Sequence, residues 1–356
     1  NQKNVKNNND INHNIKYKKY IESNYNYLLS SHSNNIKYSP LINNNFRSYL
    51  AGLIEGDGTI SISKNHNPSI NIVFNNKDFK LAEYLLEITQ CGRISKKKGN
   101  YVLWVISDLV GVYTILTLIN GYMRTPKYEY LKIIISWMNN YIIKNKDNKD
   151  SRVIKILSQI KLIDIEPLDT SELGSNAWLS GLSDADTNFA INYQKKNGKP
   201  KRIRLHYRLE MKQNYDLSIN KTINNLNLSN ITSSIEDLNY YSILYKISKF
   251  FNCSLYSRTR ELKLGSSSIN KSYFSYTVMT TNNSSNLRVI NYFNNYPLLS
   301  SKRLDFEAWV SINKFIETNG QSVMPNGSWY FAKSISMDFN KTRTTFNWDH
   351  LIFHKF

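Results

Sequence analysis

Two short segments of the chain end in the same arrangement of small and acidic residues. The first, Leu50–Gly58, reads LAGLIEGDG, and the second, Leu179–Thr187, reads LSGLSDADT. Each segment closes with two acids separated by one residue, and these are Glu55, Asp57, Asp184 and Asp186. Carboxylates at the C-terminal end of a helix face the negative end of its dipole, so they need a compensating cation. Mg²⁺ prefers oxygen ligands and keeps several waters, and acids that share such an ion with phosphate oxygens can hydrolyse a phosphodiester.

The small residues of the two segments indicate how the acids would be brought together. They stand four positions apart, and they are Gly52, Gly56, Gly181 and Ala185. Residues four apart lie on one face of a helix, and small side chains there let two helices approach closely. For one acidic pair alone, the simpler interpretation is an interface helix whose acids cap a neighbour or face water. The repetition in both segments favours a shared acidic site where the two helices end.

The elements around these helices also come in two copies. The first copy begins with a helix from about residue 46. It continues with strands at 59–63 and 69–74, a helix at 79–89, strands at 92–95 and 101–107, and helices at 108–119 and 128–141. The second copy is predicted to have the same order. A helix at 177–185 is followed by strands at 189–193 and 202–211, a helix at 240–251, strands at 254–264 and 273–280, and helices at 287–292 and 301–317. This internal repeat predicts an α+β fold made of two αββαββα halves related by a pseudo-twofold axis.

The boundaries of the halves follow from changes in composition. We expect an Asn- and Lys-rich leader, a first half, a polar linker, a second half and a C-terminal extension at 1–45, 46–143, 144–175, 176–320 and 321–356. The second half carries an Asn-rich insertion near 214–235. The pattern assigns no role to the extension. Because the chain starts with Asn1 rather than Met, we expect it to be a piece of a longer product.

Charge and composition favour a polyanionic partner. The chain has 46 Lys and Arg against 27 Asp and Glu, a net charge of +19, so nucleic acid is the leading candidate. Two cysteines exclude a disulfide scaffold and a cysteine-based zinc site. The most apolar stretch, 102–119, is interrupted by polar residues and is shorter than the ~20 apolar residues of a membrane span. The abundant Asn, Lys, Ile and Tyr share A/T-rich codons, which is typical of an AT-rich genome such as a fungal mitochondrion and can account for part of the basic excess.

The first motif is one conservative step from the LAGLIDADG signature, and the second is a recognisable variant of it. Two copies over about 270 residues resemble a single-chain LAGLIDADG homing endonuclease, or its relative the group I intron maturase. The resemblance covers roughly residues 46–320. It implies that the motif helices form the interface between the halves. It also implies two four-stranded antiparallel sheets that form a saddle along the DNA major groove.

The resemblance also implies roles for individual residues. The eighth position of each motif, Asp57 or Asp186, would bind the metal. Lysines before the last helix of each half, Lys127 and Lys302, would polarise the scissile phosphate or activate water; the alternative is a solvated lysine at a helix start. Polar residues at the end of the second strand of each half would position water, and these are Asn75 and Gln213.

Basic residues on or beside the predicted strands are candidates for nucleic-acid contacts. They are Lys96, Lys97, Lys98, Lys199, Lys201, Arg202, Arg204, Arg258, Arg260 and Lys263. Because every second residue of a strand faces the same side, Arg202 and Arg204 would point together at the backbone or the base edges. The alternative for each cluster is a solvated surface.

The second motif departs from the family pattern at two positions. Ser183 stands where an apolar residue is usual, and Thr187 stands where Gly normally follows the acid. We expect a Thr in this turn to cost about 1 kcal/mol or to force a different exit, which would aim Asp186 less well than Asp57. This departure puts double-strand cleavage in doubt.

Two functions of different classes therefore compete. One is a Mg²⁺-dependent, site-specific double-strand DNA endonuclease, active at the intron insertion site and also able to assist splicing. The other is an RNA-binding maturase that stabilises its group I intron RNA, with or without a helper splicing protein, and no longer cuts. A structural basic protein would explain the charge but not the duplicated motif. In either case we expect a monomer in the mitochondrial matrix.

Overall fold

The computed structural model describes residues 42–62, 67–215, 238–263 and 270–353. Most of the expected leader and of the Asn-rich insertion lies outside this part of the chain. The first half begins with the motif helix α2, Asn44–Asp57, and its other elements follow in the expected order. They are β1 (Gly58–Ile62), β2 (Pro68–Asn75), η1 (Asn76–Asp78), α3 (Phe79–Thr89), β3 (Arg93–Lys96), β4 (Tyr101–Ile106), α4 (Leu109–Ile119) and α5 (Tyr128–Asn145).

The second half repeats this order. Its motif helix is α7, Trp178–Asp186. The other elements are β5 (Thr187–Lys196), β6 (Lys199–Lys212), α9 (Tyr241–Phe250), β7 (Ser254–Lys263), β8 (Asn270–Met279), α10 (Asn283–Asn295) and α11 (Lys302–Asn319). The predicted α+β duplication is confirmed, including both four-stranded antiparallel sheets. The strand orders are β1-β2-β4-β3 and β5-β6-β8-β7.

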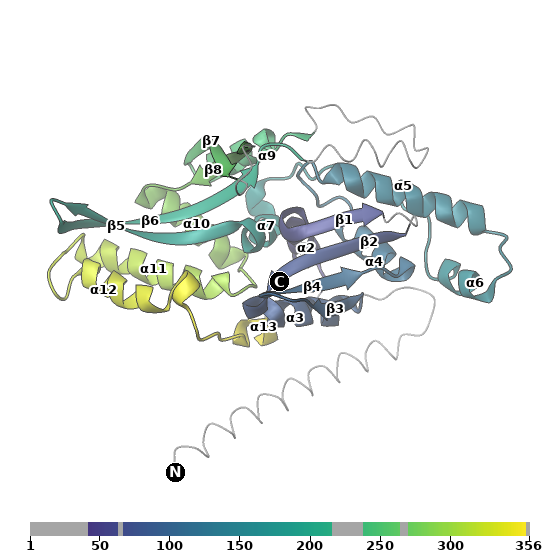
Figure 1. The fold of residues 1–356 in the computed structure, drawn as a ribbon, viewed down its shortest axis with the longest axis horizontal. Coiled ribbons are helices and arrows are strands. Elements are labelled where there is room, and N and C mark those ends of the chain that lie inside the picture. The colour runs from purple at the N-terminus through teal and green to yellow at the C-terminus, as the bar shows by residue number, and fades with distance from the viewer. Residues whose placement is uncertain (1–41, 63–66, 216–237, 264–269, 354–356) are drawn as a thin grey trace, which may run out of the picture.

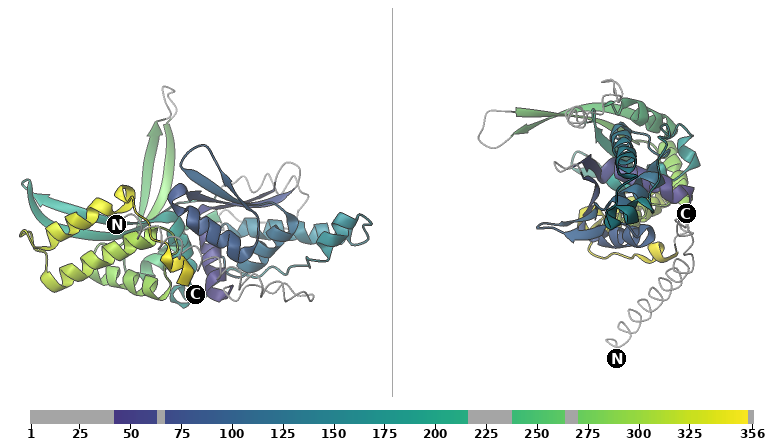
Figure 2. Two further views of the ribbon diagram at one scale, coloured as in Figure 1. Left: turned by 90° about the horizontal axis from the view of Figure 1, so that it is seen from below. Right: turned by 90° about the vertical axis from the view of Figure 1, so that its right-hand side faces the viewer.

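The sheets and helices form separate layers. In Figure 1 the two sheets lie side by side with α2 and α7 between them, and the left view of Figure 2 has the sheets on one side and most of the helices on the other. Alternation along the strands explains this layering. In β6, for example, Leu205, Tyr207 and Leu209 are buried, while Arg204, Arg208 and Glu210 are only partly buried and lie on the other face of the strand. One hydrophobic core includes residues of both halves.

Two segments outside the halves pack against them. The region between the halves contains α6 (Ser151–Leu157), and its Asp169 forms a buried ion pair of 2.6 Å with Arg124. The C-terminal extension forms α12 (Ser328–Ile335), η4 (Ser336–Asp338), η5 (Asn340–Thr342) and α13 (Asp349–Phe353). Its Arg343 pairs with the buried Asp305 of α11 at 2.9 Å. Within the described residues, no helix has the length and apolar composition that a bilayer crossing requires.

Candidate active site

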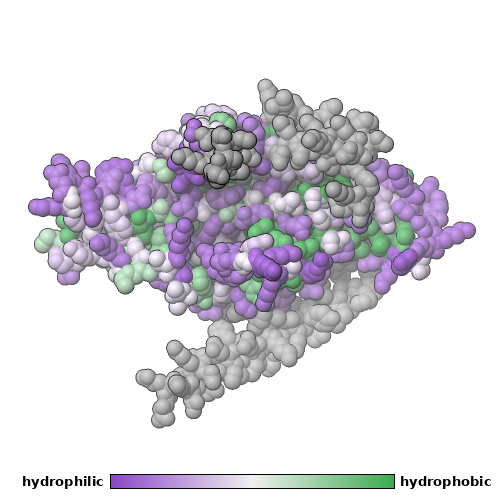
Figure 3. All heavy atoms as spheres, viewed as in Figure 1, coloured by the Kyte–Doolittle hydropathy of each residue, from purple (hydrophilic) through white to green (hydrophobic). Residues whose placement is uncertain are grey.

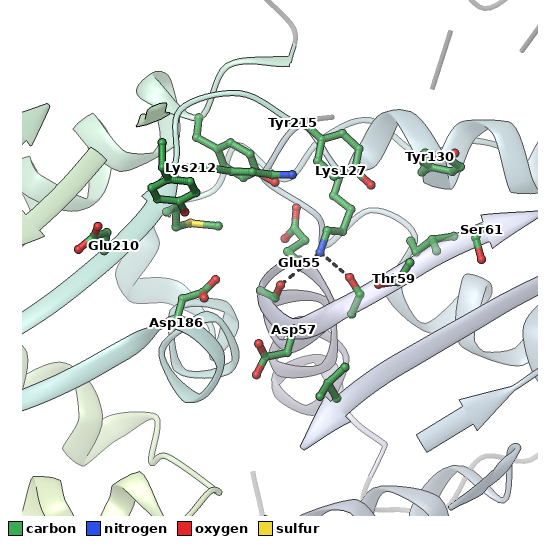
Figure 4. A pocket seen from close by; sticks show the side chains of 17 residues that line it. Glu55, Asp57, Thr59, Ser61, Lys127, Tyr130, Asp186, Glu210, Lys212 and Tyr215 are labelled. Atoms are coloured by element: carbon green, nitrogen blue, oxygen red, sulfur yellow. Dashed lines mark hydrogen bonds between the residues drawn. The ribbon is translucent and has the colours of Figure 1, made fainter. Parts of the chain in front are cut away.

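The motif helices α2 and α7 cross with their backbones in direct contact. A Cβ atom on Gly52 would lie 2.0 Å from the carbonyl oxygen of Trp178, and one on Gly181 would lie 1.9 Å from the carbonyl oxygen of Tyr49. Real Cβ contacts are much longer, so only glycine fits at either position. The crossing is therefore nearly symmetric, and it brings the acidic ends of both helices to the same place (Figure 4).

The first acid of the first motif is a structural anchor. Glu55 is buried and accepts hydrogen bonds from the backbone N–H groups of Arg124 at 2.9 Å and Thr125 at 2.6 Å. It also accepts one from the indole Nε1–H of Trp178 on α7. Burial raises the pKa of Glu55, and these hydrogen bonds lower it in part. Its oxygens hold the turn that precedes α5, so its carboxylate is already engaged by protein donors, although Glu55 also borders the cavity described below.

The first acid of the second motif does the same work. Asp184 accepts hydrogen bonds from the backbone N–H groups of Leu299 at 2.8 Å and Ser300 at 3.2 Å, next to the start of α11. It also accepts from the side-chain hydroxyl of Ser300 at 2.5 Å and from the hydroxyl of Tyr49 on α2 at 2.7 Å. Glu55 and Asp184, the inner acids of the two motifs, therefore each receive one hydrogen bond from the opposite motif helix; Asp57 and Asp186 are the outer acids. Of the two acids in each motif, only the second remains available for chemistry.

The second acids lie at the ends of the helix pair. Just before them, a Cβ on Gly56 would lie 2.1 Å from the Cβ of Ala185. Asp57 and Asp186 both border a cavity of about 610 Å³ that opens between the two sheets. Figure 4 places the two carboxylates on either side of the gap between the helix ends, from which the cavity walls extend along β1 and β6.

The electrostatics of the two carboxylates call for a cation. Burial, followed by the negative charge of Asp186, raises the pKa of Asp57 to about 6, against the pull of Lys302 and Lys127. Burial also raises the pKa of Asp186, and the same two lysines oppose the shift. Two partly buried carboxylates near one another are costly in their ionised form unless a positive charge joins them. A divalent ion would remove this cost.

The donor set fits magnesium better than a fully protein-enclosed metal. Across the described ranges, no three His, Cys, Asp or Glu side chains converge on one point. Asp57 and Asp186 can therefore supply two carboxylates, with the remaining ligands left to water and phosphate oxygens. Mg²⁺ is commonly bound in this way, through one or two carboxylates plus substrate phosphates.

Both predicted lysines point at the helix ends. The Nζ of Lys127 donates to the carbonyls of Ile54, Gly56 and Gly58, at 2.9, 3.3 and 2.6 Å. Burial lowers the pKa of Lys127 to about 8, although the nearby acids raise it in part. All three N–H donors of its ammonium are thus used by carbonyls. A direct bond to a phosphate oxygen would require one of these to break.

Lys302 repeats this arrangement on α7. Its Nζ donates to the carbonyls of Ser183, Asp184 and Ala185, at 3.2, 2.7 and 2.7 Å. Burial lowers its pKa as well. Each lysine neutralises the C-terminal carbonyls of a motif helix and supplies positive charge beneath the outer acids. This is the compensating cation that the helix dipole predicts.

The polar residues at the strand ends do not reach the cavity of the acids. Asn75 accepts a hydrogen bond from the backbone N–H of Lys77 at 3.1 Å and caps η1. Gln213 donates to the hydroxyl of Ser257 at 2.7 Å. Neither side chain borders the cavity that Asp57 and Asp186 share. Their role in positioning water remains a prediction from the family resemblance.

The expectation about the second motif was wrong. Thr187 has φ −110° and ψ 164°, an extended conformation open to any residue, so the exit of α7 carries no backbone strain. Its hydroxyl donates to the carbonyl of Ser183 at 2.7 Å. Ser183 in turn lies 3.0 Å, hydroxyl to hydroxyl, from Tyr207. The polar substitutions are satisfied inside the second half, and Asp186 leaves its helix as Asp57 does.

Several residues of the site were missed by sequence reasoning. Trp178 and Tyr49 could have been found, because each immediately precedes the first leucine of its motif. Other aromatic and polar side chains border the cavity, namely Tyr130, Glu210, Lys212, Tyr215, Tyr240 and Tyr273. These come from segments far from the two motifs in sequence, and no motif marks them.

Most of the predicted basic residues lie at the surface of the strands. Arg202 and Arg204 share a face of β6, as the alternation predicts, and Arg202 donates to the side chain of Gln194 at 2.7 Å. Lysines of the two strand turns are exposed: Lys96, Lys97, Lys98, Lys199 and Lys201. Arg258 and Arg260 lie on β7 and pair with Glu210. The side chain of Lys263 lies outside the described residues.

Known proteins resemble this chain in sequence and in fold. The model of the LAGLIDADG endonuclease family matches residues 50–138 and 179–313. An intron-encoded DNA endonuclease, aI3, from Saccharomyces cerevisiae is 45% identical over 313 residues, covering 85% of this chain and 71% of the relative. A cox1 intron-2 protein of 37.2 kDa from Schizosaccharomyces pombe is 29% identical over 281 residues, covering 79% and 69%.

The solved structures agree on the fold. The LAGLIDADG meganuclease I-AabMI, bound to uncleaved DNA, superposes with a TM-score of 0.54 at 16% identity, covering 83% of this chain and 99% of that one. I-SmaMI, bound to cleaved DNA, gives 0.55 at 15% identity, with 84% and 98% covered. Together with the duplicated motif helices and the paired outer acids, these matches show that the chain belongs to the LAGLIDADG endonuclease family.

Proposed function

We propose that the protein is an intron-encoded, site-specific DNA endonuclease that cuts both strands of a duplex at the insertion site of its intron. The observation that carries this proposal is the division of labour among the four motif acids. Glu55 and Asp184 are consumed by backbone N–H groups, whereas Asp57 and Asp186 meet at an open cavity between two sheets. Partly buried carboxylates that raise each other's cost of ionisation are typical of a catalytic site.

Mg²⁺ held by Asp57 and Asp186 would stabilise the charge that develops on the scissile phosphate and activate the attacking water. The chain's own contribution is to fix these two carboxylates at rigid helix ends. Lys127 and Lys302 keep the helix ends neutral and favour the ionised acids. The sheets flank the site and carry the arginines and lysines that can bind phosphates. A single chain contains both halves, so a monomer would suffice.

The first experiment is a cleavage assay with a duplex that spans the intronless exon junction, in Mg²⁺ and in EDTA. We expect Asp57→Asn and Asp186→Asn each to lower the cleavage rate about 100- to 1000-fold, the effect of losing one fixed electrostatic contact to the transition state. Asp147→Asn is the matched control, because it removes the same charge from a side chain that is 86% exposed. Cleavage that survives both active-site changes would refute the proposal.

We also propose that the protein assists the splicing of its group I intron RNA. The supporting observation is an aromatic pair on α9, on the helix side of the second sheet. The rings of Tyr241 and Tyr245, 50% and 42% exposed, stack 5.7 Å apart, and the Nζ of Lys249 lies 5.1 Å from the centre of the Tyr245 ring. Exposed aromatic rings beside lysines are typical of surfaces on which unpaired bases stack.

This second role has its own test. Tyr241→Ala with Tyr245→Ala should weaken binding of the intron RNA by about tenfold, since each stacked base contributes roughly 1–3 kcal/mol. DNA cleavage by the same variant should be unchanged. A variant that binds the RNA as tightly as the wild type would remove this surface from consideration. Adding a mitochondrial extract to the splicing assay would reveal a need for a helper protein.

The relatives also guide the proposed location. Curated relatives of this chain come from fungi and are named for introns, one of them in a cox1 gene. The abundance of residues with A/T-rich codons agrees with a fungal mitochondrial gene. We propose that the protein acts in the mitochondrial matrix, which fractionation of the host cells would test.

A further inference from the structure

One acidic side chain lies among the basic residues of the open sheet face. Glu210 belongs to β6, where Leu209 and Met211 are buried, so Glu210 shares the open side with Arg208 and Lys212. It also borders the cavity of the catalytic acids, and Figure 4 shows it on β6 beside Asp186. A carboxylate here repels the phosphates of any bound nucleic acid. Glu210 therefore cannot be present to strengthen the binding of nucleic acid in general.

Glu210 is surrounded by arginines and a hydroxyl group. Its carboxylate forms ion pairs with Arg208 and, at 2.7 Å, with Arg260, while the nearest nitrogen of Arg258 lies 3.7 Å away. The hydroxyl of Ser275 donates to it at 2.9 Å. Partial burial acts to raise the pKa of Glu210, but Ser275 and the arginines outweigh it and leave the pKa below its usual range. The acid is therefore ionised at neutral pH.

The exposures show which groups face the ligand. The side chain of Glu210 is 16% exposed, whereas those of Arg258 and Arg260 are 45% and 46% exposed. The acid thus lies beneath the two arginines on the sheet and restrains them from below. A guanidinium has five N–H donors, so those not used by Glu210 remain directed outward. An arginine fixed in this way suits the paired O6 and N7 acceptors of guanine better than a mobile phosphate contact does.

We propose that Glu210 is a specificity-determining residue, which positions Arg258 and Arg260 to read a guanine in the half-site that the second sheet binds. This inference rests on the proposed binding of duplex DNA. Glu210 touches no base in this arrangement and acts through the arginines. Its loss should therefore change which sequences bind more than how tightly DNA binds.

The first sheet provides an internal control. Gly58, the first residue of β1, pairs with Ile72, and Thr187, the first residue of β5, pairs with Leu209. The residue after Leu209 is Glu210, so its counterpart in the first half is Val73. An apolar residue replaces the acid there, and the guanine preference is expected on one side of the target only.

The test is a binding-site selection without cleavage, in Ca²⁺, from duplexes randomised on both sides of the centre. Wild-type protein should recover guanine at one or more positions on the second-half side. Glu210→Gln should lose roughly tenfold or more of that preference, the scale of one bidentate base contact. Its affinity for an unrelated duplex should stay equal or rise, because a negative charge has left the DNA face.

Further variants separate this role from a structural one. Arg260→Lys keeps the charge but loses the planar fork, so it should lose the guanine preference and keep its affinity for the unrelated duplex. Arg202→Gln, on the same strand but bonded to Gln194, should weaken all duplexes alike. A Glu210→Gln protein that keeps the guanine preference, or that weakens all duplexes equally, would overturn the inference. If the wild type bound no duplex, the proposed function itself would fail.

Discussion

The two halves of the protein repeat one another at the helix pair and diverge on the sheets. At the centre, Glu55 and Asp184 hold equivalent turns, and Lys127 and Lys302 bind equivalent helix-end carbonyls. On the sheets, the position held by Glu210 in the second half is held by Val73 in the first. Figure 3 shows apolar residues over the first sheet and mostly hydrophilic ones over β5 and β6.

This difference separates two requirements of the proposed function. The same hydrolysis must occur on both DNA strands, so the central geometry has to be the same in both halves. The two half-sites of a natural target need not match, so the reading surfaces are free to differ. The symmetry is thus retained where backbone contacts impose it and lost where side chains face solvent.

The largest expected effect tests the symmetry of the centre. Gly52→Ala and Gly181→Ala should each lower the free energy of unfolding by about 3 kcal/mol or more, because each new Cβ would meet a backbone carbonyl at 2 Å or less. Thermal and urea unfolding would measure both. Gly198→Ala, at a β5–β6 turn with no atom within 4 Å, is the control, with a cost of about 1 kcal/mol from its positive φ. If the two variants lost unequal amounts of unfolding free energy, the helix crossing would not be symmetric.

A second prediction concerns pH and the outer acids. The pKa of Asp57 is raised from 3.8 to about 6, so the cost of ionising it in the folded state develops between about pH 4 and pH 6 and is fully present above pH 6. In metal-free protein, Asp57→Asn should therefore be more stable than the wild type by about 3 kcal/mol at pH 7, at about 1.36 kcal/mol per pKa unit. This advantage should vanish as the pH falls towards 4, and it should shrink when Mg²⁺ is added.

The same measurement compares the two halves. Asp186→Asn should behave with the same sign, because burial also raises the pKa of Asp186. Urea unfolding at several pH values would follow both variants. An Asp57→Asn protein less stable than the wild type at pH 7 would contradict the cost that burial and the neighbouring charge of Asp186 place on the ionised Asp57.

A third prediction sharpens the contrast between the sheets. Arg202→Gln with Arg204→Gln should reduce the slope of log affinity against log salt by about 2, since each phosphate contact contributes about 0.9. Fluorescence anisotropy between 50 and 200 mM salt, concentrations in the range where such losses are large, would detect a change of about tenfold in affinity. Asn71→Gln on the first sheet is the control and should leave the slope unchanged. Equal slopes in the variant and the wild type would assign both arginines to the solvated surface.

The smallest expected effect falls on Val73. Its side chain is 42% exposed on the open face, where it can contact the methyl group of a thymine. Val73→Ser should lower a thymine preference on the first-half side by about fivefold and leave the second-half side unchanged. The randomised-duplex selection described above measures both sides at once. A change on the second-half side would show that the two surfaces are not independent.

The sequence was most informative where chemistry and backbone packing coincide. Small residues four apart and terminal acids predicted the crossing helices, and period-2 stretches predicted the strands in order. Only the family resemblance singled out Asp57; the residue types alone could not separate it from Glu55, because their roles depend on N–H groups of a turn about 70 residues away. The supposed cost of Thr187 failed for the same reason, since its φ is set by the tertiary path of the chain. The role of Glu210 could not be predicted, because two of the arginines that it pairs with, Arg258 and Arg260, lie on another strand about 50 residues away.

The crossed hydrogen bonds of the inner acids have a consequence for folding. Glu55 receives the indole of Trp178, and Asp184 receives the hydroxyl of Tyr49, so each half completes a buried polar site of the other. A half that folded alone would contain a buried carboxylate without one of its donors, which is costly. The halves should therefore lose their structure together, and calorimetry of the intact protein should record a single cooperative transition despite the duplicated architecture.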